Sequence, residues 1–424
     1  MRKLLIGGGN ELRGEVSIAG AKNASLPILV STLLIDDYES VITNIPNIVD
    51  INIIAELLMH LGVNVKISDG TAVVDSRTIT STEAPYEIVN KMRASFWVLG
   101  SLLGRFGEAK VSLPGGCAIG LRPCDIYIDA LNKMEIETKV ENGYVVAKAK
   151  KNNRPQGADI TFRLPSVGAT HNTIMAAVLA EGTTIIRNAA REPEVVDLIG
   201  FLTSAGAKIE GAGTDTIRIE GVQKLHSTKH RVIGDRIEAF SYMIAAAITN
   251  SRLVLTGINF FDMLESPINI LRSMKVNVEK SDDYTVIVST NNELNPINYL
   301  ETGVFPGFPT DCQATLVSLL GLVRGTSTIK ETIFENRYMH VSELNRLGAN
   351  IIVENDKAII NGVDRYSGAE ITATDLRAGM GLVLAGIGAD GITKINNIHH
   401  IERGYENLID KLSGCGADIK IIDE

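Results

Sequence analysis

The sequence is poor in aromatic residues and in cysteine, and each shortage restricts what the chain can be. Aromatic residues make up 5% of the 424 residues, with a single Trp, so any hydrophobic core must be mainly aliphatic. The cysteines, which are Cys117, Cys124, Cys312 and Cys415, show no CxxC spacing, and a chain of this length is expected to keep them as free thiols. Without CxxC or HExxH motifs, no metal is expected.

Long apolar runs and an excess of positive charge are also absent. No apolar stretch approaches the roughly 18 residues that a membrane span requires, and the basic N-terminus becomes glycine-rich before a signal peptide could form. We therefore expect a cytoplasmic protein that does not bind membranes. The net charge of −9 argues against nucleic-acid binding, so an anionic substrate would need a local cluster of cations.

Internal repetition is the most informative feature that the sequence does contain. An amphipathic helix, a turn of small residues and two strands recur at intervals of roughly 70 residues. These elements begin at Leu57, Ala130, Phe201, Leu271, Leu344 and Leu412. An almost wholly apolar helix, a turn and a strand precede each of them, and a helix that is apolar all round should be buried. The pattern predicts an α/β fold of six βαβαββ-like units, with buried helices and sheets outside them.

The length of the chain favours two domains, with three repeated units in each. The junction is expected near residues 229–235, between the third and fourth units. One domain would contain residues 21–232 with the Cys117 loop, and the other residues 233–424 together with residues 1–20, whose strand returns to it. The active site is expected in the cleft between the two domains.

Two segments place reactive or cationic side chains beside glycine or a helix start. The GGCAIG segment sets Cys117 in a glycine-flanked loop just before Arg122, where it could be either a reactive thiol or a partly buried structural cysteine. In AGAKNASLPIL, Lys22 and Asn23 precede an apolar helix, either as an anion site or as an exposed helix start.

The second half of the chain adds a carboxylate and three cations. Asp311 in FPTDCQATL precedes a buried helix and is expected to serve as its N-cap, a role compatible with catalysis. Arg337, Arg377 and Arg403 each lie at a junction between half-units. Because loops of repeated units converge there, the three arginines suggest a cationic cluster.

Eight motifs together resemble one family. AGAKNASLPIL, PGGCAIGLRPCD, SVGAT, NAAREPEVVD, FPGFPTD, FENRYMHV, DLRAGMGLVLAG and IERGYE are similar to segments of the UDP-N-acetylglucosamine 1-carboxyvinyltransferases, which are enolpyruvyl transferases of peptidoglycan synthesis. The matches run in order from Lys22 to Glu406. The resemblance implies two inside-out α/β barrels. It also implies transfer of the enolpyruvyl group of phosphoenolpyruvate to the 3-hydroxyl of UDP-N-acetylglucosamine, through a tetrahedral intermediate and without a cofactor.

The resemblance also implies roles for individual residues. Cys117 would be the general acid, and it would be the target of phosphonate epoxide inhibitors of the fosfomycin type. Asp311 would be the general base. Phosphoenolpyruvate would be held by Lys22, Asn23, Arg122 and Arg403 at its phosphate and by Arg337 and Arg377 at its carboxylate. The UDP-sugar would be bound by Arg93, Arg122, Pro123, Cys124, Asp125, Ile126, Ser166, Val167, Gly168, Asp311 and Ile333.

The sequence departs from the family at two positions. Many relatives have His where this chain has Tyr127, and Lys where it has Leu164; Arg163 beside the latter is a candidate replacement. These changes affect the expected contacts with the nucleotide diphosphate. Two alternatives remain open: a 5-enolpyruvylshikimate-3-phosphate synthase on the same fold, whose GNAGTAMRP-type segment is absent here, and a non-catalytic UDP-sugar sensor.

Overall fold

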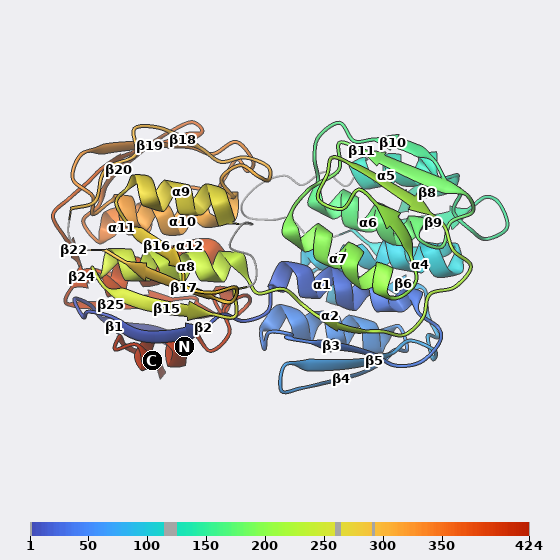
Figure 1. The fold of residues 1–424 in the computed structure, drawn as a ribbon, viewed down its shortest axis with the longest axis horizontal. Coiled ribbons are helices and arrows are strands. Elements are labelled where there is room, and N and C mark those ends of the chain that lie inside the picture. Colours follow the sequence, from blue (N-terminus) through green and yellow to red (C-terminus); the bar gives the residue numbers. More distant parts are fainter. Residues whose placement is uncertain (1, 114–124, 259–263, 291–292, 424) are drawn as a thin grey trace. The chain divides into compact units, whose positions relative to one another are not determined.

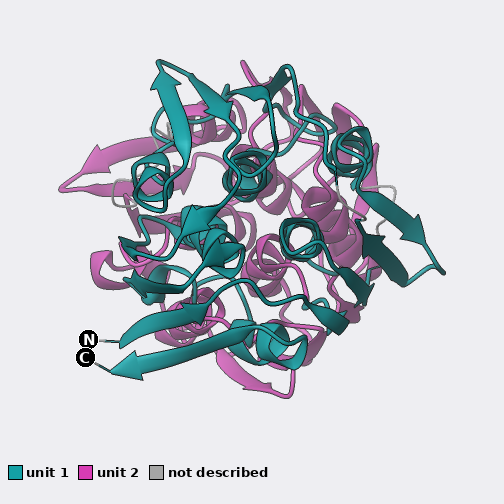
Figure 2. Cartoon of the chain, turned by 90° about the vertical axis from the view of Figure 1, so that its left-hand side faces the viewer, with its two compact units in different colours: residues 1–19, 118–121, 234–424 teal, residues 20–117, 122–233 magenta. Residues whose placement is uncertain are grey.

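The computed structural model describes residues 2–113, 125–258, 264–290 and 293–423. The described residues form two compact units (Figures 1 and 2). One unit contains residues 20–113 and 125–233, and the other contains residues 2–19 and the described residues from 234 onward. The chain therefore passes from one unit to the other at residues 19–20 and returns at residues 233–234.

The unit around residues 20–233 is built from three successive repeats, each with one buried helix, one amphipathic helix and a four-stranded sheet. Its helices are α1 (Lys22–Ser31), η1 (Thr32–Leu34), α2 (Val49–His60), α3 (Tyr86–Val89), η2 (Arg93–Trp97), α4 (Val98–Phe106), α5 (Asp125–Lys133), α6 (Val167–Ala177) and α7 (Pro193–Ser204). Its strands are β3 (Ser40–Thr43), β4 (Asn64–Ser68), β5 (Thr71–Asp75), β6 (Glu83–Ala84), β7 (Glu108–Ser112), β8 (Ile136–Glu141), β9 (Tyr144–Ala149), β10 (Asp159–Thr161), β11 (Thr183–Arg187), β12 (Lys208–Glu210), β13 (Thr216–Glu220) and β14 (Lys229–Arg231).

The other unit repeats the same plan three times. Its helices are α8 (Arg236–Ile248), α9 (Glu265–Ser273), α10 (Thr310–Leu320), α11 (Val341–Arg346), α12 (Leu376–Ile387), η4 (Ile398–His400) and α13 (Leu408–Gly414). Its strands are β1 (Arg2–Gly7), β2 (Arg13–Ser17), β15 (Arg252–Thr256), β16 (Asn277–Lys280), β17 (Thr285–Ser289), β18 (Leu300–Glu301), β19 (Thr326–Lys330), β20 (Asn350–Glu354), β21 (Lys357–Asn361), β22 (Tyr366–Ser367), β23 (Glu370–Thr372), β24 (Ala389–Asp390), β25 (Ile392–Asn396) and β26 (Asp418–Asp423).

Each four-stranded sheet begins with a parallel pair and continues with two antiparallel neighbours. The order β10-β11-β13-β12 is an example, with β10 parallel to β11. Strands that are distant in sequence complete three sheets. β14 pairs with β3, β2 pairs with β15, and β1 lies between β25 and β26. The N-terminal strand thus joins the sheet of the last repeat, which brings both chain termini into the same unit (Figure 1).

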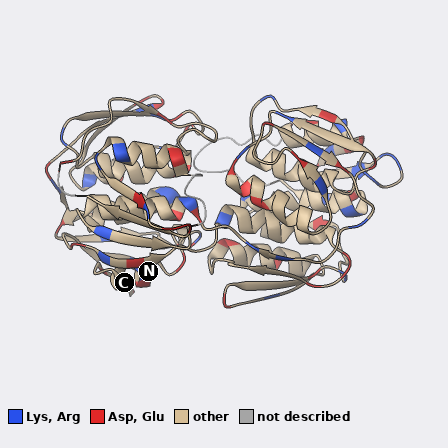
Figure 3. Ribbon diagram, viewed as in Figure 1, with Lys and Arg blue, Asp and Glu red and all other residues tan. Residues whose placement is uncertain are grey.

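The apolar helices form the interior of each unit. In one unit α8, α10 and α12 pack against one another, and in the other α4 packs against α1 and α6. These helices carry few charged residues (Figure 3), and in Figure 2 the teal unit has helices toward its middle and strands at its rim. The core is largely aliphatic, as the sequence composition predicts. Because the apolar helices are buried and the sheets lie outside them, the predicted fold class is confirmed.

The two chain segments that connect the units are hydrogen-bonded to each other. The amide of Ala21 donates to the carbonyl of Ile233 at 2.7 Å, and the amide of Asp235 donates to Ala19 at 2.8 Å. Glu238 on α8 accepts from the Ala19 amide at 2.7 Å, and its carboxylate also lies 2.7 Å from the ammonium of Lys411 on α13. Both connections are therefore tied to structured backbone on either side.

Candidate active site

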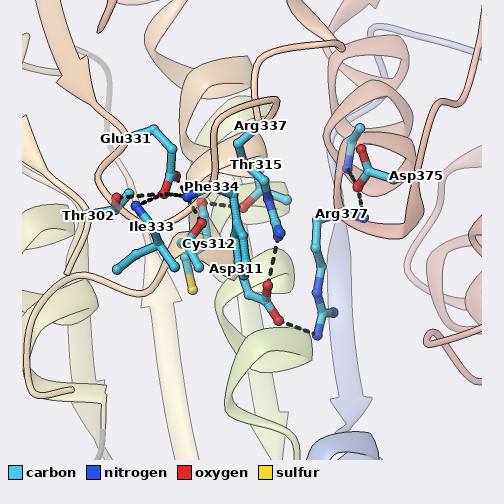
Figure 4. Close-up of polar contacts among 12 residues, drawn as sticks. Thr302, Asp311, Cys312, Thr315, Glu331, Ile333, Phe334, Arg337, Asp375 and Arg377 are labelled. Atoms are coloured by element: carbon cyan, nitrogen blue, oxygen red, sulfur yellow. Dashed lines mark hydrogen bonds and ion pairs between the residues drawn. The ribbon is translucent and has the colours of Figure 1, made fainter. Parts of the chain in front are cut away.

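Asp311 lies between two arginines at the start of the buried helix α10 (Figure 4). Arg337 donates from Nη2 to one carboxylate oxygen at 2.7 Å, and Arg377 donates from Nη2 to the other at 3.1 Å. Both arginines are almost fully buried, whereas the Asp311 side chain is 26% exposed. About a quarter of the Asp311 side chain is therefore accessible to solvent, while two buried guanidiniums hold its carboxylate in place.

Asp311 does not cap α10, so that expectation is wrong. Pro309 occupies the N-cap position and Thr310 is the first helical residue, which leaves Asp311 within the first turn. Its side chain turns toward the two arginines instead of back to the helix amides. The carboxylate binds the two buried guanidiniums in preference to the helix amides, because hydrogen bonds between charged partners are stronger than those to neutral amides.

The buried helices of this unit begin near one another. Burial alone would lower the pKa of Arg377 at the start of α12, but the charges of Asp311 on α10 and Asp235 at the N-cap of α8 raise it above its usual value. The Arg377–Asp311 bond at 3.1 Å brings the starts of α12 and α10 together. The hydroxyl of Tyr405, which accepts from Arg377, also hydrogen-bonds to Ser241 on α8 at 2.9 Å, so α8 approaches the same place. Helix N-termini carry partial positive charge, and with the arginines they favour a bound anion.

The turn that contains Arg403 packs on the start of α12. The guanidinium of Arg377 lies over the ring of Tyr405, 5.7 Å from its centre, and donates to its hydroxyl at 3.4 Å. Gly404 fits closely against Leu376, because a Cβ there would lie 2.6 Å from a Leu376 methyl. The structure thus brings the Arg403 segment next to Arg377, as the predicted cationic cluster requires.

In the other unit, Lys22 forms a buried ion pair with Asp50. The Lys22 ammonium lies 2.7 Å from Oδ2 of Asp50, which is fully buried in the first turn of α2. Lys22 and Asn23 are the first two residues of α1, so they lie inside its first turn and not before it. The ion pair fixes the position of an ammonium group at a helix N-terminus, which is suited to binding an anion.

Several other predicted residues lie at the starts of α5 and α6. Ser166 caps α6 by accepting from the amide of Ala169 at 3.3 Å, and Val167 and Gly168 are the first residues of that helix. The ring of Tyr127 covers this start: a Cβ at Gly168 would lie 2.0 Å from the Tyr127 hydroxyl. A larger residue at position 168 would require the Tyr127 side chain to move.

Asp125 begins α5 and pairs with Arg163 at 2.5 Å, both side chains being about half exposed. Arg163 is thus engaged with a predicted site residue, while the neighbouring Leu164 is exposed. Ile126 is buried in α5, and Arg93 begins η2. Cys117, Arg122, Pro123 and Cys124 lie outside the described residues.

The two described cysteines are buried and poorly suited to react. Burial raises the pKa of the Cys312 thiol far above its ordinary value and raises that of Cys415 as well. Both are free thiols. Because the thiolate is the reactive form of cysteine, both thiols should react more slowly with an electrophile than an exposed cysteine of ordinary pKa.

Within the described parts of the chain, no cluster of His, Cys, Asp and Glu could hold a metal ion. No helix among those residues is long and apolar enough to cross a membrane.

Comparison with known proteins assigns the chain and its fold to a family. The family model described as EPSP synthase (3-phosphoshikimate 1-carboxyvinyltransferase) matches residues 6–412. The chain is also 49% identical over 424 residues to a UDP-N-acetylglucosamine 1-carboxyvinyltransferase of Granulibacter bethesdensis, with 100% of both chains covered. The chain belongs to the UDP-N-acetylglucosamine 1-carboxyvinyltransferase family of enolpyruvyl transferases.

Other members and structures support this assignment. The family member of Acinetobacter baylyi is 48% identical, with 99% of each chain covered. Among solved structures, the enolpyruvyl transferase NikO from Streptomyces tendae has a TM-score of 0.89 and 26% identity, covering 99% of this chain and 98% of its own. The EPSP synthase of Acinetobacter baumannii has a TM-score of 0.76 at 17% identity with full coverage of both, which shows the shared fold.

Sequence analysis did not single out two buried carboxylates that contact, or lie next to, the candidate site residues. Asp50, the partner of Lys22, lies in an amphipathic helix and belongs to none of the recognised motifs. Glu331 follows β19 and accepts four hydrogen bonds beside Asp311. An acidic residue at a buried position of an apolar pattern would have been the available signal for Asp50.

Proposed function

We propose that this chain transfers the enolpyruvyl group of phosphoenolpyruvate to the 3-hydroxyl of UDP-N-acetylglucosamine and releases phosphate, the first committed step of peptidoglycan synthesis. The observation that carries the proposal is the carboxylate of Asp311, held between Arg337 and Arg377 at the start of the buried helices α10 and α12. Full-length relatives of 45–49% identity that carry this transferase's name support the choice of substrates.

Asp311 is the proposed base, and the arginines explain how it would be activated. In the structure both guanidiniums bind the Asp311 carboxylate. Hydrogen bonds from cations favour the ionised form of a carboxylate and make it a weaker proton acceptor. The carboxylate of phosphoenolpyruvate offers the same pair of arginines an equivalent partner. When the substrate takes over one or both guanidiniums, Asp311 loses cationic partners and becomes able to accept the proton of the attacking 3-hydroxyl.

The phosphate of phosphoenolpyruvate requires its own cations. Lys22, held by Asp50, is a proposed ligand together with Asn23, Arg122 and Arg403. The tetrahedral intermediate keeps both anionic groups while bonds change at the carbon between them, so fixed cations stabilise it without rearranging. The proposed roles are divided between the two compact units, with Lys22 in one and Asp311 in the other.

Cys117 is the proposed general acid that protonates the methylene carbon of phosphoenolpyruvate. A phosphonate epoxide of the fosfomycin type, which is anionic like phosphoenolpyruvate, is the proposed covalent inhibitor at its thiol. The UDP-sugar is the proposed ligand of Arg93, the segment 122–126, Ser166 to Gly168 and Ile333. Because Arg163 pairs with Asp125, a nucleotide diphosphate would compete with Asp125 for that guanidinium.

The two alternatives receive less support. The likeness to EPSP synthases at 17% identity concerns the fold alone. A sensor without turnover would have no use for a carboxylate held in a position suited to accept a proton. We place the reaction in the cytoplasm, which cell fractionation would test. The function itself is tested by incubating the chain with both substrates: mass spectrometry should find the enolpyruvyl ether of the UDP-sugar, and recovery of unchanged substrates would reject the proposal.

A further inference from the structure

Glu331 is a buried carboxylate that accepts hydrogen bonds from three separate segments. It lies directly after β19 and is 4% exposed. The hydroxyls of Thr302 and Thr310 each donate to it at 2.9 Å. The amides of Ile333 and Phe334 donate at 2.9 and 3.2 Å, so the carboxylate also closes the turn that follows it.

Glu331 with its hydrogen bonds lies close to Asp311 and its arginines (Figure 4), and two links connect the two groups. Thr310, which binds Oε2 of Glu331, is the residue immediately before Asp311. In the second link, the guanidinium of Arg337 lies over the ring of Phe334, 5.5 Å from its centre, and reaches Asp311 at 2.7 Å. Glu331 is therefore linked to Asp311 through Thr310 and to Arg337 through Phe334.

A second set of bonds anchors the turn to the neighbouring strand. The amide of Thr332 donates to the hydroxyl of Thr302 at 2.9 Å, and the hydroxyl of Thr332 donates to the carbonyl of Thr302 at 2.6 Å. These bonds extend the parallel pairing of β18 with β19 past the end of the strands. These bonds hold the turn in place against the strand. The Thr310–Glu331 bond in turn holds the start of α10 against the turn.

We propose that Glu331 is a positioning residue for the transfer reaction. It sets the position of Asp311 relative to Arg337 and to the turn that carries Ile333, and it acts through Thr310 without touching substrate. This inference rests on the proposed function. Displacement of a catalytic group by a fraction of an ångström is enough to slow an enzyme, so loss of the Thr310–Glu331 bond should be visible in turnover.

The Thr310→Val variant tests the proposal, because it removes the hydroxyl and keeps the shape of the side chain. We expect kcat to fall about tenfold, with the acidic limb of its pH profile displaced and the Kd for the UDP-sugar within about twofold of the parent value. Thr310→Ser, which keeps the hydroxyl, should restore kcat. Thr326→Val is the matched control, since Thr326 is exposed at the start of β19 and its hydroxyl binds only at the surface, to Asn361.

The outcomes separate this inference from the proposed function. If the parent chain is active and Thr310→Val matches the Thr326→Val control in kcat and pH profile, Glu331 has no positioning role, even if the melting temperature falls. Equal loss of kcat in the Val and Ser variants would also overturn the proposal. In a Glu331→Ala background, where that protein folds, adding Thr310→Val should have no further effect on kcat. A parent chain without transfer activity would instead count against the function.

Discussion

Arg337 and Arg377 reach opposite oxygens of one carboxylate, at 2.7 and 3.1 Å from Asp311. The three side chains come from separate segments of the chain: Asp311 from α10, Arg337 from the turns before α11 and Arg377 from the start of α12. Two buried cations therefore share a single anion that is partly open to solvent. In the proposed reaction, the carboxylate of phosphoenolpyruvate would exchange with Asp311 without leaving either guanidinium unpaired.

Replacing Asp311 by Asn removes the proposed proton acceptor and the charge that occupies the arginines. We expect turnover to fall by about 10²-fold or more, while phosphoenolpyruvate binds at least as tightly because the guanidiniums no longer have a competing carboxylate. Steady-state kinetics and calorimetry would check the two expectations. Asp410→Asn is the control, because Asp410 is exposed on α13. Near-normal turnover in Asp311→Asn would mean that the base lies elsewhere.

Replacing Asp50 by Asn tests whether the buried ion pair positions Lys22. The Asn side chain keeps the volume but loses the charge that lies 2.7 Å from the ammonium. We expect kcat/KM for phosphoenolpyruvate to fall about tenfold or more, and the melting temperature to fall because a buried charge loses its partner. Asp36→Asn is the matched control, since Asp36 pairs with Lys224 at 3.6 Å and both are about half exposed. Equal kinetics in the two variants would mean that Asp50 does not position Lys22.

Much of the fold could be predicted because the sequence repeats. Helices such as α12 are apolar on every side, and burial is the only stable solution for such a helix. The short edge strands could not be found this way. β14 has the sequence Lys-His-Arg, which shows no alternation of apolar and polar residues, and its place beside β3 depends on a contact between distant parts of the chain.

The sequence supplies candidate site residues but not their arrangement. Local rules assigned Asp311 to a helix cap, and the two arginines that displace it from that role come from distant segments. Asp50 and Glu331 were missed because their importance comes from the partners that folding brings to them. Periodicity places such residues on a helix face or in a turn and gives no information about those partners.

Labelling with a phosphonate epoxide tests the reactivity proposed for Cys117. The two cysteines of the described structure, Cys312 and Cys415, are buried with raised pKa values, so they should stay unmodified. Mass spectrometry of the digested protein should find the adduct on the Cys117 peptide. Cys124 is the control close in sequence, and equal labelling of Cys117 and Cys124 would indicate general exposure in place of a tuned thiol.

His171 should make the folded chain sensitive to acid. Burial on α6 lowers its pKa from 6.5 to about 3, and Trp97 packs edge-on at 5.0 Å. Between about pH 6.5 and about pH 3 this histidine binds a proton in the unfolded chain but not in the folded chain. The free energy of unfolding is therefore highest above about pH 6.5 and decreases as the pH falls. By about pH 5 the loss amounts to about 2 kcal/mol.

Denaturation of His171→Asn at several pH values would check this expectation. The difference in unfolding free energy between about pH 7.5 and about pH 5 should be smaller than in the parent chain by roughly the same amount. His60→Asn, at an exposed position of α2, should keep the parental dependence. An unchanged dependence in His171→Asn would mean that the buried imidazole does not titrate as inferred.

Phosphate release is the most direct test of the proposed reaction. The chain is mixed with phosphoenolpyruvate and UDP-N-acetylglucosamine in the presence of a chelator, and inorganic phosphate is measured over time. The account predicts release that requires the UDP-sugar, continues without added metal, and is slowed by Asp311→Asn. Release that depends on shikimate 3-phosphate in place of the UDP-sugar, or no release with either acceptor, would contradict it.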